Sequence, residues 1–507
     1  MTLWAALTLL MVVLSYVFTL LMAAACVCLP LLLFGAWMHV ASFVLLLYGI
    51  ATAAVILWSL PPRRDRFAPP GPELKRAEQP TLFAEIDTLS STLGEAPPSA
   101  VYLLPEVNAW VAEREGWMGI GSRRVMGVGL PLMRVLNTAQ FRAVLAHEIA
   151  HYYRGDTRLL PFVRHAQTAM ARTLATLGSP KFAEAVSHHG LSQLAHTIVF
   201  SGISAWWKGF MRVIQAVSRR QEYRADELSC RIAGSGNLVN GLCRLNEAEA
   251  AITPFYATEL LPALSAGIRP PIADGFAHYL SVPEIAAAAA ASLDGVLKQD
   301  RGDPYDSHPP LRDRIAAARS ISPSVHPECS AATRPAIEWL VDIERLEAEL
   351  LMCLGVSEQG AQLRVLAWDQ IGSEVYVPMW RDAVQQCGTA LNAYRVAALP
   401  EAVSSLSQVA ARIPDPEGML LTREERSERA SQLLVRALAL AAYEEGWQLR
   451  AEPGEFELRR DQHRLAPAKV VADLRSGAMS AEAWRGWATA AGIAKRRLAP
   501  QGRANSA

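Results

Sequence analysis

The first 62 residues contain no Asp, Glu, Lys or Arg. Within them, Thr2–Cys28 and Leu31–Leu60 are each long enough for a membrane-spanning helix, which needs about 20 apolar residues. Pro30 separates the two stretches. The sequence therefore predicts a transmembrane helical hairpin over residues 1–62, with a short connection near Leu29–Gly35.

A cleaved signal peptide is the alternative explanation for this stretch. Signal peptides begin with a basic segment and have a shorter apolar run, and neither feature is present, so we favour the hairpin. Arg63, Arg64 and Arg66 follow the second apolar stretch directly. Because basic loops stay on the cytoplasmic side, we expect a multi-pass protein of the inner (cytoplasmic) membrane whose N-terminus and main body face the cytoplasm.

The overall composition narrows the class of protein. A chain of 507 residues allows more than one domain, and 51% hydrophobic residues agree with a lipid-embedded part. The formal net charge of zero argues against nucleic-acid binding, which favours a basic balance. The seven cysteines are odd in number and scattered, so we expect no disulfide framework and a reducing compartment.

The segment Asn137–Asp156 predicts a metal-binding helix. His147 and His151 are four residues apart, so they lie on one face of a helix and can direct their imidazoles at one ion. Glu148 lies beside that face, where its carboxylate can act as a general base on a water at the metal without binding the metal itself.

Local signals support the helix. Asn137 or Thr138 can cap its start, Gln140 stands where a capping-box partner would, and Gly155 fits its C-terminal end. The alternative is an ordinary surface helix, because the pattern H-E-x-x-H is short enough to arise by chance. Two histidines within an apolar helix favour the metal site, since buried histidines need partners.

Short strands precede this helix in the sequence. Thr81–Gly94 has helical spacing, Ala100–Leu104 predicts a strand, and Glu106–Val111 and Gly116–Gly129 predict paired strands interrupted by glycines. A peptide substrate can add itself to such a strand beside a metal-binding helix. The alternative is an ordinary core hairpin, and the spacing alone favours that alternative.

Four motifs occur in an order that resembles the HtpX and CaaX-prenyl-protease family of membrane zinc metallopeptidases. They are VNAWV, GVGLPLMRVLNTAQFRAVLAHEIAHYYRGD, SRRQEYRADELSCRIAG at Ser218–Gly234 and SHPPLRDRI at Ser307–Ile315. The resemblance covers about Arg66–Arg319 and the hairpin before it. It implies a mainly α fold with a small β-sheet (an α+β zincin-type core), one catalytic Zn2+ ion and a protein or peptide substrate.

The resemblance also implies roles for individual residues. His147 and His151 match the helical zinc ligands, Glu148 matches the catalytic base, and Glu222 in QEYRAD matches the third ligand. Two histidines and one carboxylate from a separate helix leave an open position, as a catalytic zinc requires. Asp226 follows Glu222 by one helical turn and can orient a ligand imidazole. The alternative for this acidic pair is a solvated, charged helix face.

Two further sites follow from the same resemblance. Asn108 and Ala109 match the family's N-A strand motif, which implies contacts with the substrate backbone. His308 matches the histidine of the H-P-P loop, where we expect a catalytic role in transition-state stabilisation or a gating contact with the metal. The alternative is a loop histidine held rigid by Pro309 and Pro310.

The segment between the metal motifs departs from the HtpX pattern. The resemblance implies two further membrane helices there, whereas Leu159–Gly178 is interrupted by Arg164, His165 and Arg172. Leu191–Val217 contains two basic residues and several aromatic ones, which predicts an interfacial helix or a lid over the cleft. Whether Leu191–Val217 enters the membrane stays open at this point.

The remaining chain carries no recognisable catalytic constellation. A hairpin turning at Pro453–Gly454 and a helix with Trp484 and Trp487 predict a small partner- or substrate-binding module. The expected organisation is a transmembrane hairpin (1–62), a linker (63–80), a zinc metallopeptidase domain (81–320), a helical region (321–445), a small α+β module (446–494) and a disordered tail (495–507).

Together these features predict a membrane-anchored zinc endopeptidase that acts on membrane proteins or their exposed segments, in quality control or processing. Processing of prenylated C-termini is a weaker alternative, because the chain lacks the many spans of that relative. A non-catalytic membrane scaffold is the alternative from another class. It predicts no bound zinc and no effect of Glu148→Gln.

Overall fold

The computed structural model describes residues 3–34, 40–153, 159–187, 190–298, 302–321, 334–355, 363–415 and 421–499. The chain divides into two compact units. The first comprises Met1–Glu249 and Ala290–Val356, and the second comprises Ala250–Ala289 and Ser357–Ala507. The fold is mainly helical with small sheets, which confirms the predicted class.

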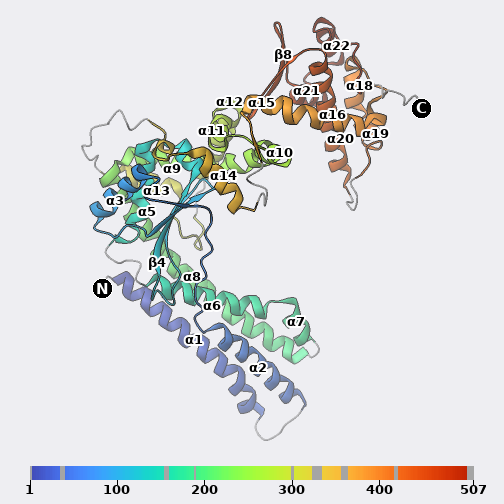
Figure 1. Cartoon of the computed structure of the whole chain (residues 1–507). Helices are drawn as coiled ribbons and strands as arrows, with labels where there is room; N and C mark the ends of the chain where they lie inside the picture. Colours follow the sequence, from blue (N-terminus) through green and yellow to red (C-terminus); the bar gives the residue numbers. More distant parts are fainter. Residues whose placement is uncertain are drawn as a thin grey trace. The chain divides into compact units, whose positions relative to one another are not determined.

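The charge-free N-terminal stretch forms two apolar helices, α1 (Leu3–Phe34) and α2 (Val40–Ser59), which pack side by side (Figure 1). Helix α1 continues through Pro30 to Phe34, so the predicted connection does not begin at Leu29; residues 35–39 lie outside the described residues. A proline removes one helical hydrogen bond, and this cost is tolerated in apolar membrane-type helices. α2 comes very close here, since a Cβ on Gly49 would lie 1.9 Å from the carbonyl oxygen of Cys26.

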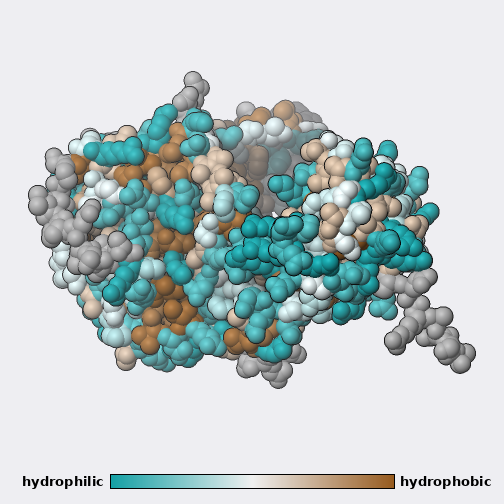
Figure 2. All heavy atoms as spheres, turned by 90° about the horizontal axis from the view of Figure 1, so that it is seen from above, coloured by the Kyte–Doolittle hydropathy of each residue, from teal (hydrophilic) through white to brown (hydrophobic). Residues whose placement is uncertain are grey.

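Exposed apolar side chains gather on this hairpin. More than half of the large hydrophobic side chains that are exposed belong to α1 and α2. By contrast, the face in Figure 2 intersperses hydrophilic and hydrophobic residues. Among the described residues, Ala6–Leu32 is long and apolar enough to cross a membrane, whereas the described apolar part of α2, Phe43–Ser59, is shorter.

Helices α6 (Leu160–Leu177) and α8 (Gly190–Ala233) lie beside the hairpin, and α7 (Pro180–Ser187) comes between them in the chain (Figure 1). Both long helices contact α1 and α2. The shared apolar clusters contain Val12, Val163, Ala166, Phe210 and Ile214, and Ala23, Ala53, Ile56, Leu177 and Ile203. Leu191–Val217 thus belongs to a 44-residue helix that packs on the hairpin. The later part of the same helix carries Glu222.

A four-stranded sheet precedes helix α5 (Thr138–Ala150), which carries the predicted metal ligands, in the chain. Its strands lie in the order β1-β2-β4-β3, which makes β3 an edge strand. β2 is antiparallel to β1 and parallel to β4, and β3 is antiparallel to β4. The predicted strand at Ala100–Leu104 and the predicted strand pair after it are both confirmed. The bounds are β1 Glu73–Leu74, β2 Ala100–Leu104, β3 Ala109–Arg114 and β4 Arg123–Gly129.

The rest of the first unit is helical. Helix α5 packs against α8 and against β3, so the sheet and the longest helix both support it. A buried apolar cluster joins Ala143 of α5 to Cys230, Leu238 and Ile315. The further elements are α3 Pro80–Leu93, α4 Leu130–Val135, α5 Thr138–Ala150, α13 Leu311–Arg319, η4 Ala336–Trp339 and α14 Ile343–Cys353. Helices α9 (Ser235–Phe255) and α12 (Pro283–Lys298) each contribute residues to both units.

The second unit is built on one large apolar core. Residues of the predicted helical region and of the predicted α+β module share this core, for example Leu434 and Trp484. Leu498 and Ala499 are buried in it too, so the predicted disordered tail does not begin at Lys495; residues 500–507 lie outside the described residues. The helices are η2 Tyr256–Leu260, α10 Leu261–Ser265, α11 Ile272–Ser281, α15 Trp368–Ile371, η6 Gly372–Tyr376, α16 Val377–Gln386, α17 Gly388–Leu391, η7 Val396–Ala398, α18 Leu399–Ser404, α19 Leu406–Ala410, α20 Arg423–Glu444, α21 Pro467–Ser476 and α22 Ala481–Ala490.

The second unit contains two small sheets. One pairs β5 (Ile268–Arg269) with β6 (Arg364–Val365) in parallel. The other has β7 (Gln448–Glu452), β8 (Glu455–Arg460) and β9 (His463–Leu465), and its first turn is the predicted hairpin turn at Pro453–Gly454.

Candidate active site

Helix α5 begins as the sequence predicts. The Asn137 side chain accepts a hydrogen bond from the Gln140 amide (2.8 Å), and the Gln140 side chain accepts one from the Asn137 amide (3.1 Å). The regular helix ends at Ala150, but His151 keeps helical backbone angles (φ −57°, ψ −23°). The i, i+4 relation between His147 and His151 is therefore preserved. The predicted stop at Gly155 lies outside the described residues.

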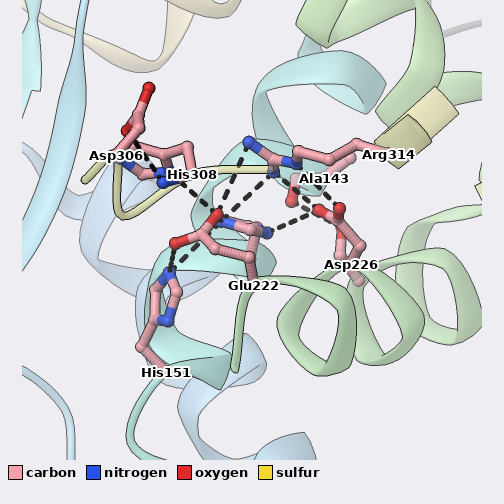
Figure 3. Close-up of polar contacts among 9 residues, drawn as sticks. Ala143, His151, Glu222, Asp226, Asp306, His308 and Arg314 are labelled. Atoms are coloured by element: carbon pink, nitrogen blue, oxygen red, sulfur yellow. Dashed lines mark hydrogen bonds and ion pairs between the residues drawn. The ribbon is translucent and has the colours of Figure 1, made fainter. Parts of the chain in front are cut away.

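Three side chains from two helices meet at the end of α5 (Figure 3). The Nε2 atoms of His147 and His151 are 3.2 Å apart. Each of these atoms lies 3.5 Å from a carboxylate oxygen of Glu222, which comes from α8. His147 and Glu222 are buried, with 6% and 5% of their surface exposed. The structure thus brings together the three residues that the sequence singles out as ligands.

The donor set fits a tetrahedral metal ion. Ligand bonds of 2.0–2.1 Å in tetrahedral geometry place neighbouring ligand atoms about 3.3 Å apart, close to the three distances above. Charge supports the same conclusion, because among the described residues Arg314 is the permanent cation that Glu148, Glu222 and Asp226 face. A divalent cation would balance these three carboxylates. Residues of this kind and spacing can hold zinc.

Asp226 and Arg314 form a buried ion pair behind the ligands. The Arg314 guanidinium donates two hydrogen bonds to the Asp226 carboxylate, of 2.8 and 2.7 Å. The Oδ1 atom of this carboxylate, which accepts the 2.7 Å bond, also lies 2.9 Å from Nδ1 of His147. An acceptor at Nδ1 keeps the proton on that nitrogen and leaves Nε2 free for a metal. A hydrogen bond also joins α8 to α5 directly, because the Ser229 hydroxyl donates to the carbonyl oxygen of Ala143 (2.7 Å).

Arg314 is the residue of this site that sequence reasoning missed. Its guanidinium also lies 3.5 Å from Oε2 of Glu222 and 3.5 Å from Nε2 of His147. The buried positions of α13 are Leu311, Arg314, Ile315 and Ala318, which is the i, i+3, i+4, i+7 pattern of one helix face. An arginine on that apolar face needs a buried acidic partner, and this was the available signal.

Electrostatics sets the protonation of the ligands. Burial acts to lower the pKa of His147, but contacts with Asp226 and Glu222 raise it to about 9. Burial and the charge of His147 lower the pKa of His151 to about 4. Burial acts to raise the pKa of Glu222, yet His147 and His308 hold it below its ordinary value. A carboxylate that keeps its charge beside two imidazoles attracts a metal cation.

Glu148 directly follows His147 in the sequence, and its side chain is half-buried. Burial raises its pKa to about 7, with opposing effects from the positive charge of His147 and the negative charge of Glu222. A carboxylate with a pKa near neutrality is suited to accept and return a proton.

His308 reaches the site from the loop before α13, as expected from the sequence. Its Nδ1 lies 3.0 Å from Oε2 of Glu222, and this contact raises the pKa of His308. The Asp306 carboxylate accepts a hydrogen bond from the His308 amide (2.9 Å), which fixes the loop (Figure 3). The His308 side chain is 59% exposed, so it faces the open side of the site.

Asn108 and Ala109 lie at the start of the edge strand β3. The carbonyl oxygen of Asn108 accepts a hydrogen bond from the Gly129 amide (2.8 Å), and Ala109 pairs with Val128 of β4. Further along β3, the carbonyl oxygen of Val111 accepts a hydrogen bond from the Tyr152 hydroxyl, one residue after His151 (3.2 Å). The edge strand is thus tied to the end of helix α5, which carries the candidate ligands.

A second group of potential ligands lies in the second unit, where His278 is 3.0 Å from Glu452 and 3.9 Å from Glu455. Arg450 is 3.6 and 3.3 Å from the same two carboxylates. Ion pairing accounts for this partly exposed group, and we assign no metal to it.

Comparison with known proteins agrees with this geometry. Residues 80–322 match the model of Peptidase family M48. Protease HtpX of Pseudomonas entomophila (strain L48) is 26% identical over 238 residues, which cover 46% of this chain and 70% of that protein. Protease HtpX of Hahella chejuensis (strain KCTC 2396) is 28% identical over 250 residues, covering 47% of this chain and 73% of that protein. No solved structure matches the chain.

The matched region contains the edge strand, the helix α5, the ligand-bearing part of α8 and the helix α13. The resemblance inferred from the four sequence motifs is therefore confirmed. Residues 80–322, just under half of the chain, are thus similar to the metallopeptidases of family M48 and to the HtpX proteases.

Proposed function

We propose that this chain is a membrane-anchored zinc endopeptidase whose metal ligands are His147, His151 and Glu222. The observation that carries the proposal is the convergence of their three ligand atoms within 4.8 Å of one another. The general-base candidate Glu148 adjoins the first of them in the chain. This arrangement lies inside the region that matches a peptidase family.

Zinc, when bound by these three residues, supplies Lewis-acid polarisation of a carbonyl and lowers the pKa of water. All other parts of the reaction fall to the protein's own residues. Glu148 accepts the proton of the attacking water and then delivers it to the nitrogen of the leaving amine. Its raised pKa of about 7 suits both steps.

Asp226 and Arg314 position the first histidine rather than touch the substrate. The carboxylate of Asp226 orients His147 through Nδ1, and Arg314 holds that carboxylate in place. His308 faces the open side beside Glu222, where an imidazole can donate a hydrogen bond to developing negative charge on the substrate.

The substrate backbone would lie along β3. This strand is at the edge of the sheet, so its outer side can form main-chain hydrogen bonds with an extended peptide. Asn108 and Ala109 begin the strand, and the Tyr152 hydroxyl ties it to the metal-binding helix. A peptide bound there would run beside the ligands.

The topology we propose has the α1–α2 hairpin in the inner membrane and the peptidase domain in the cytoplasm. Arg63, Arg64 and Arg66 directly after α2 support this orientation. Exposed apolar side chains on α6 and α8, such as Phe162 and Leu194, indicate that these helices accompany the hairpin toward lipid. Substrates would then be membrane proteins or their exposed segments, in quality control or processing.

The competing functions receive less support. The relatives are proteases by name, so a non-catalytic scaffold is not favoured. Processing of prenylated C-termini is not favoured either, because the similar proteins are HtpX proteases.

The deciding experiment compares purified wild type with Glu148→Gln. We expect wild type to contain one zinc ion per chain and to cleave a membrane-protein substrate. Glu148→Gln should retain the zinc and lose cleavage by at least about a hundredfold, because only the proton transfer is removed. Equal cleavage by both proteins, or wild type without zinc, would refute the mechanism. Glu227→Gln, an exposed carboxylate of α8, is the matched control.

We also propose that the second unit binds a peptide partner. It contains a cavity of about 800 Å³ with an aromatic wall, where Tyr376 stacks on Trp380 and Trp380 meets Phe456 edge-on. Glu259 and Tyr376, hydrogen-bonded at 3.2 Å, come from the π-helical turns η2 and η6. Such turns are frequent at functional sites. No cation contacts Glu259 among the described residues, so a basic side chain of the partner would complement it.

Peptide binding by the full-length protein tests this proposal. Acetylated, amidated peptides with a central arginine should bind, and the same peptides with norleucine should bind at least about tenfold more weakly. Glu259→Gln should remove the preference, whereas Glu482→Gln, an exposed carboxylate on α22, should not. Equal affinity for both peptides would refute a site for a basic side chain.

A further inference from the structure

A second cavity, of about 420 Å³, lies in the first unit at the end of α2. Three segments line it: the linker after α2, the tip of the β3–β4 hairpin and the helix α6. The lining is strongly basic and includes Arg63, Arg64, Arg66, Arg114, Arg164 and Arg172. Three carboxylates also line the cavity, so the charge balance depends on which groups are already paired.

The carboxylates all have partners. Asp65 lies 3.1 Å from Nε of Arg114 and accepts a hydrogen bond from the Glu115 amide (2.9 Å). Glu115 lies 2.9 Å from a guanidinium nitrogen of Arg123. Glu113 accepts a hydrogen bond from a serine hydroxyl (2.7 Å). Arginines therefore compensate two of the three negative charges, whereas the charge of Glu113 faces the remaining arginines of the cavity.

Five arginines of the cavity contact no carboxylate among the described residues, namely Arg63, Arg64, Arg66, Arg164 and Arg172. Arg164 donates only to the carbonyl oxygen of Glu113 (3.4 Å), and Arg172 only to that of Ser59 (2.6 Å). The Nε atom of Arg172 is buried without a hydrogen-bond partner. Several unpaired guanidinium groups around one cavity repel one another, and an anion bound between them would remove this repulsion.

The cavity lies at the level where lipid headgroups are expected. α2 has 20 residues, the length of one membrane span, and it ends at Ser59. The Arg63 guanidinium is 4.4 Å from the ring centre of Trp58, whose side chain is 63% exposed. A tryptophan and an arginine at the end of an apolar helix mark the membrane interface.

The hairpin tip adds apolar side chains to the same place. Trp117 and Ile120 are 50% and 73% exposed, although both are large and hydrophobic. The indole nitrogen of Trp117 donates to the carbonyl oxygen of Pro62, which holds the tip beside the end of α2 (3.3 Å). Apolar side chains next to a basic cavity match a molecule that has both an acyl chain and an anionic group.

We propose that this cavity binds the phosphate group of an anionic phospholipid. Guanidinium groups bind phosphate oxygens through paired hydrogen bonds, and Arg63, Arg64, Arg164 and Arg172 supply such groups from two sides of the cavity. The bound lipid joins the linker, the hairpin tip and α6. The proposal rests on the membrane anchorage described above but not on peptidase activity. Because β3 leads from the hairpin tip to Asn108, the lipid also fixes the edge strand relative to the bilayer.

Lipid retention by the full-length protein tests this inference. The protein is equilibrated with micelles of equimolar phosphatidylglycerol and phosphatidylcholine, and retained lipid is counted by native mass spectrometry. Wild type should retain phosphatidylglycerol preferentially. Arg64→Gln/Arg164→Gln should weaken retention by about 30-fold, as expected for two basic residues at a membrane surface. Arg76→Gln/Arg231→Gln removes the same charge outside the cavity and should have no effect.

Three results would overturn the proposal. Equal retention of the two lipids would exclude a site for an anionic headgroup. Equal losses in the cavity variant and the control variant would show a general charge effect. Displacement of the lipid by millimolar inorganic phosphate would identify a site for a free anion. None of these readouts involves Glu148 or the metal ligands, so a failure here leaves the proposed peptidase function untouched.

Discussion

Variants of the buried ion pair Asp226–Arg314 should affect the free energy of unfolding and the affinity for zinc in different ways. Only 1% of Asp226 and 8% of Arg314 is exposed. Arg314→Met removes the cation and leaves the carboxylate buried without its two hydrogen bonds. Removing one partner of a buried pair costs about 3–5 kcal/mol of unfolding free energy. Arg312→Met, two residues earlier on the same helix and exposed, should change stability by less than about 0.5 kcal/mol.

The double variant Arg314→Met/Asp226→Leu makes the decisive comparison. An apolar pair of similar volume often replaces a buried ion pair at little cost, so stability should return close to wild type. Zinc affinity should not return, because His147 has lost the acceptor at Nδ1; we expect it to remain about 10–100-fold weaker. Unfolding by denaturant is measured on metal-free protein, and zinc affinity by competition with a fluorescent chelator.

Two outcomes would refute this reasoning. If Arg314→Met costs less than about 1 kcal/mol, the guanidinium does not neutralise a buried charge. If the double variant binds zinc as tightly as wild type, Asp226 does not orient the ligand histidine. In either case the pair would be a passive part of the core.

Three further changes test other parts of the molecule. Burial raises the pKa of Glu259 above its ordinary value of 4.5. The unfolding free energy of wild type, compared with that of Glu259→Gln, should therefore be highest below pH 4.5 and should fall as the pH rises through the raised pKa. A difference in unfolding free energy that is constant with pH would contradict this. Asn137→Ala removes the capping box and should cost about 1 kcal/mol, measured by denaturant unfolding. Gly49→Leu places a side chain against the Cys26 carbonyl oxygen and should lower the thermal stability in detergent, whereas Gly209→Ala, with open space around it, should not.

Sequence reasoning succeeded where a local pattern determines the structure. The capping box at Asn137, the strand at Ala100–Leu104 and the turn at Pro453–Gly454 depend on a few neighbouring residues, and all three appear in the structure. The convergence of Glu222 with the histidines was inferred from a resemblance rather than from spacing. Nothing local could show it, because Glu222 lies 71 positions after His151 in the chain.

The features that the sequence did not predict correctly depend on packing between distant parts of the chain. Pro30 looks like a break, but α1 continues through it because α2 packs closely on that part of the helix. Lys495 was expected to begin a disordered tail, but Leu498 and Ala499 fill a core built from distant helices. Arg314 was overlooked because its partner Asp226 lies on another helix. In each case, the deciding contact joins residues far apart in the chain.

Helix α8 connects the apolar bundle to the proposed metal site without interruption. Ile214 is buried against α1 and α6, whereas Glu222, eight residues later, is a proposed ligand. At 1.5 Å per residue, these positions are about 12 Å apart along the helix axis. An extended chain covers this distance in about four residues. Because the helix has no break between these positions, the site cannot move far from the bundle while both ends stay packed. A membrane-protein substrate should therefore be cut within a few residues of its membrane-spanning segment, and cleavage that depends little on this distance would show that α8 does not act as a rigid connection.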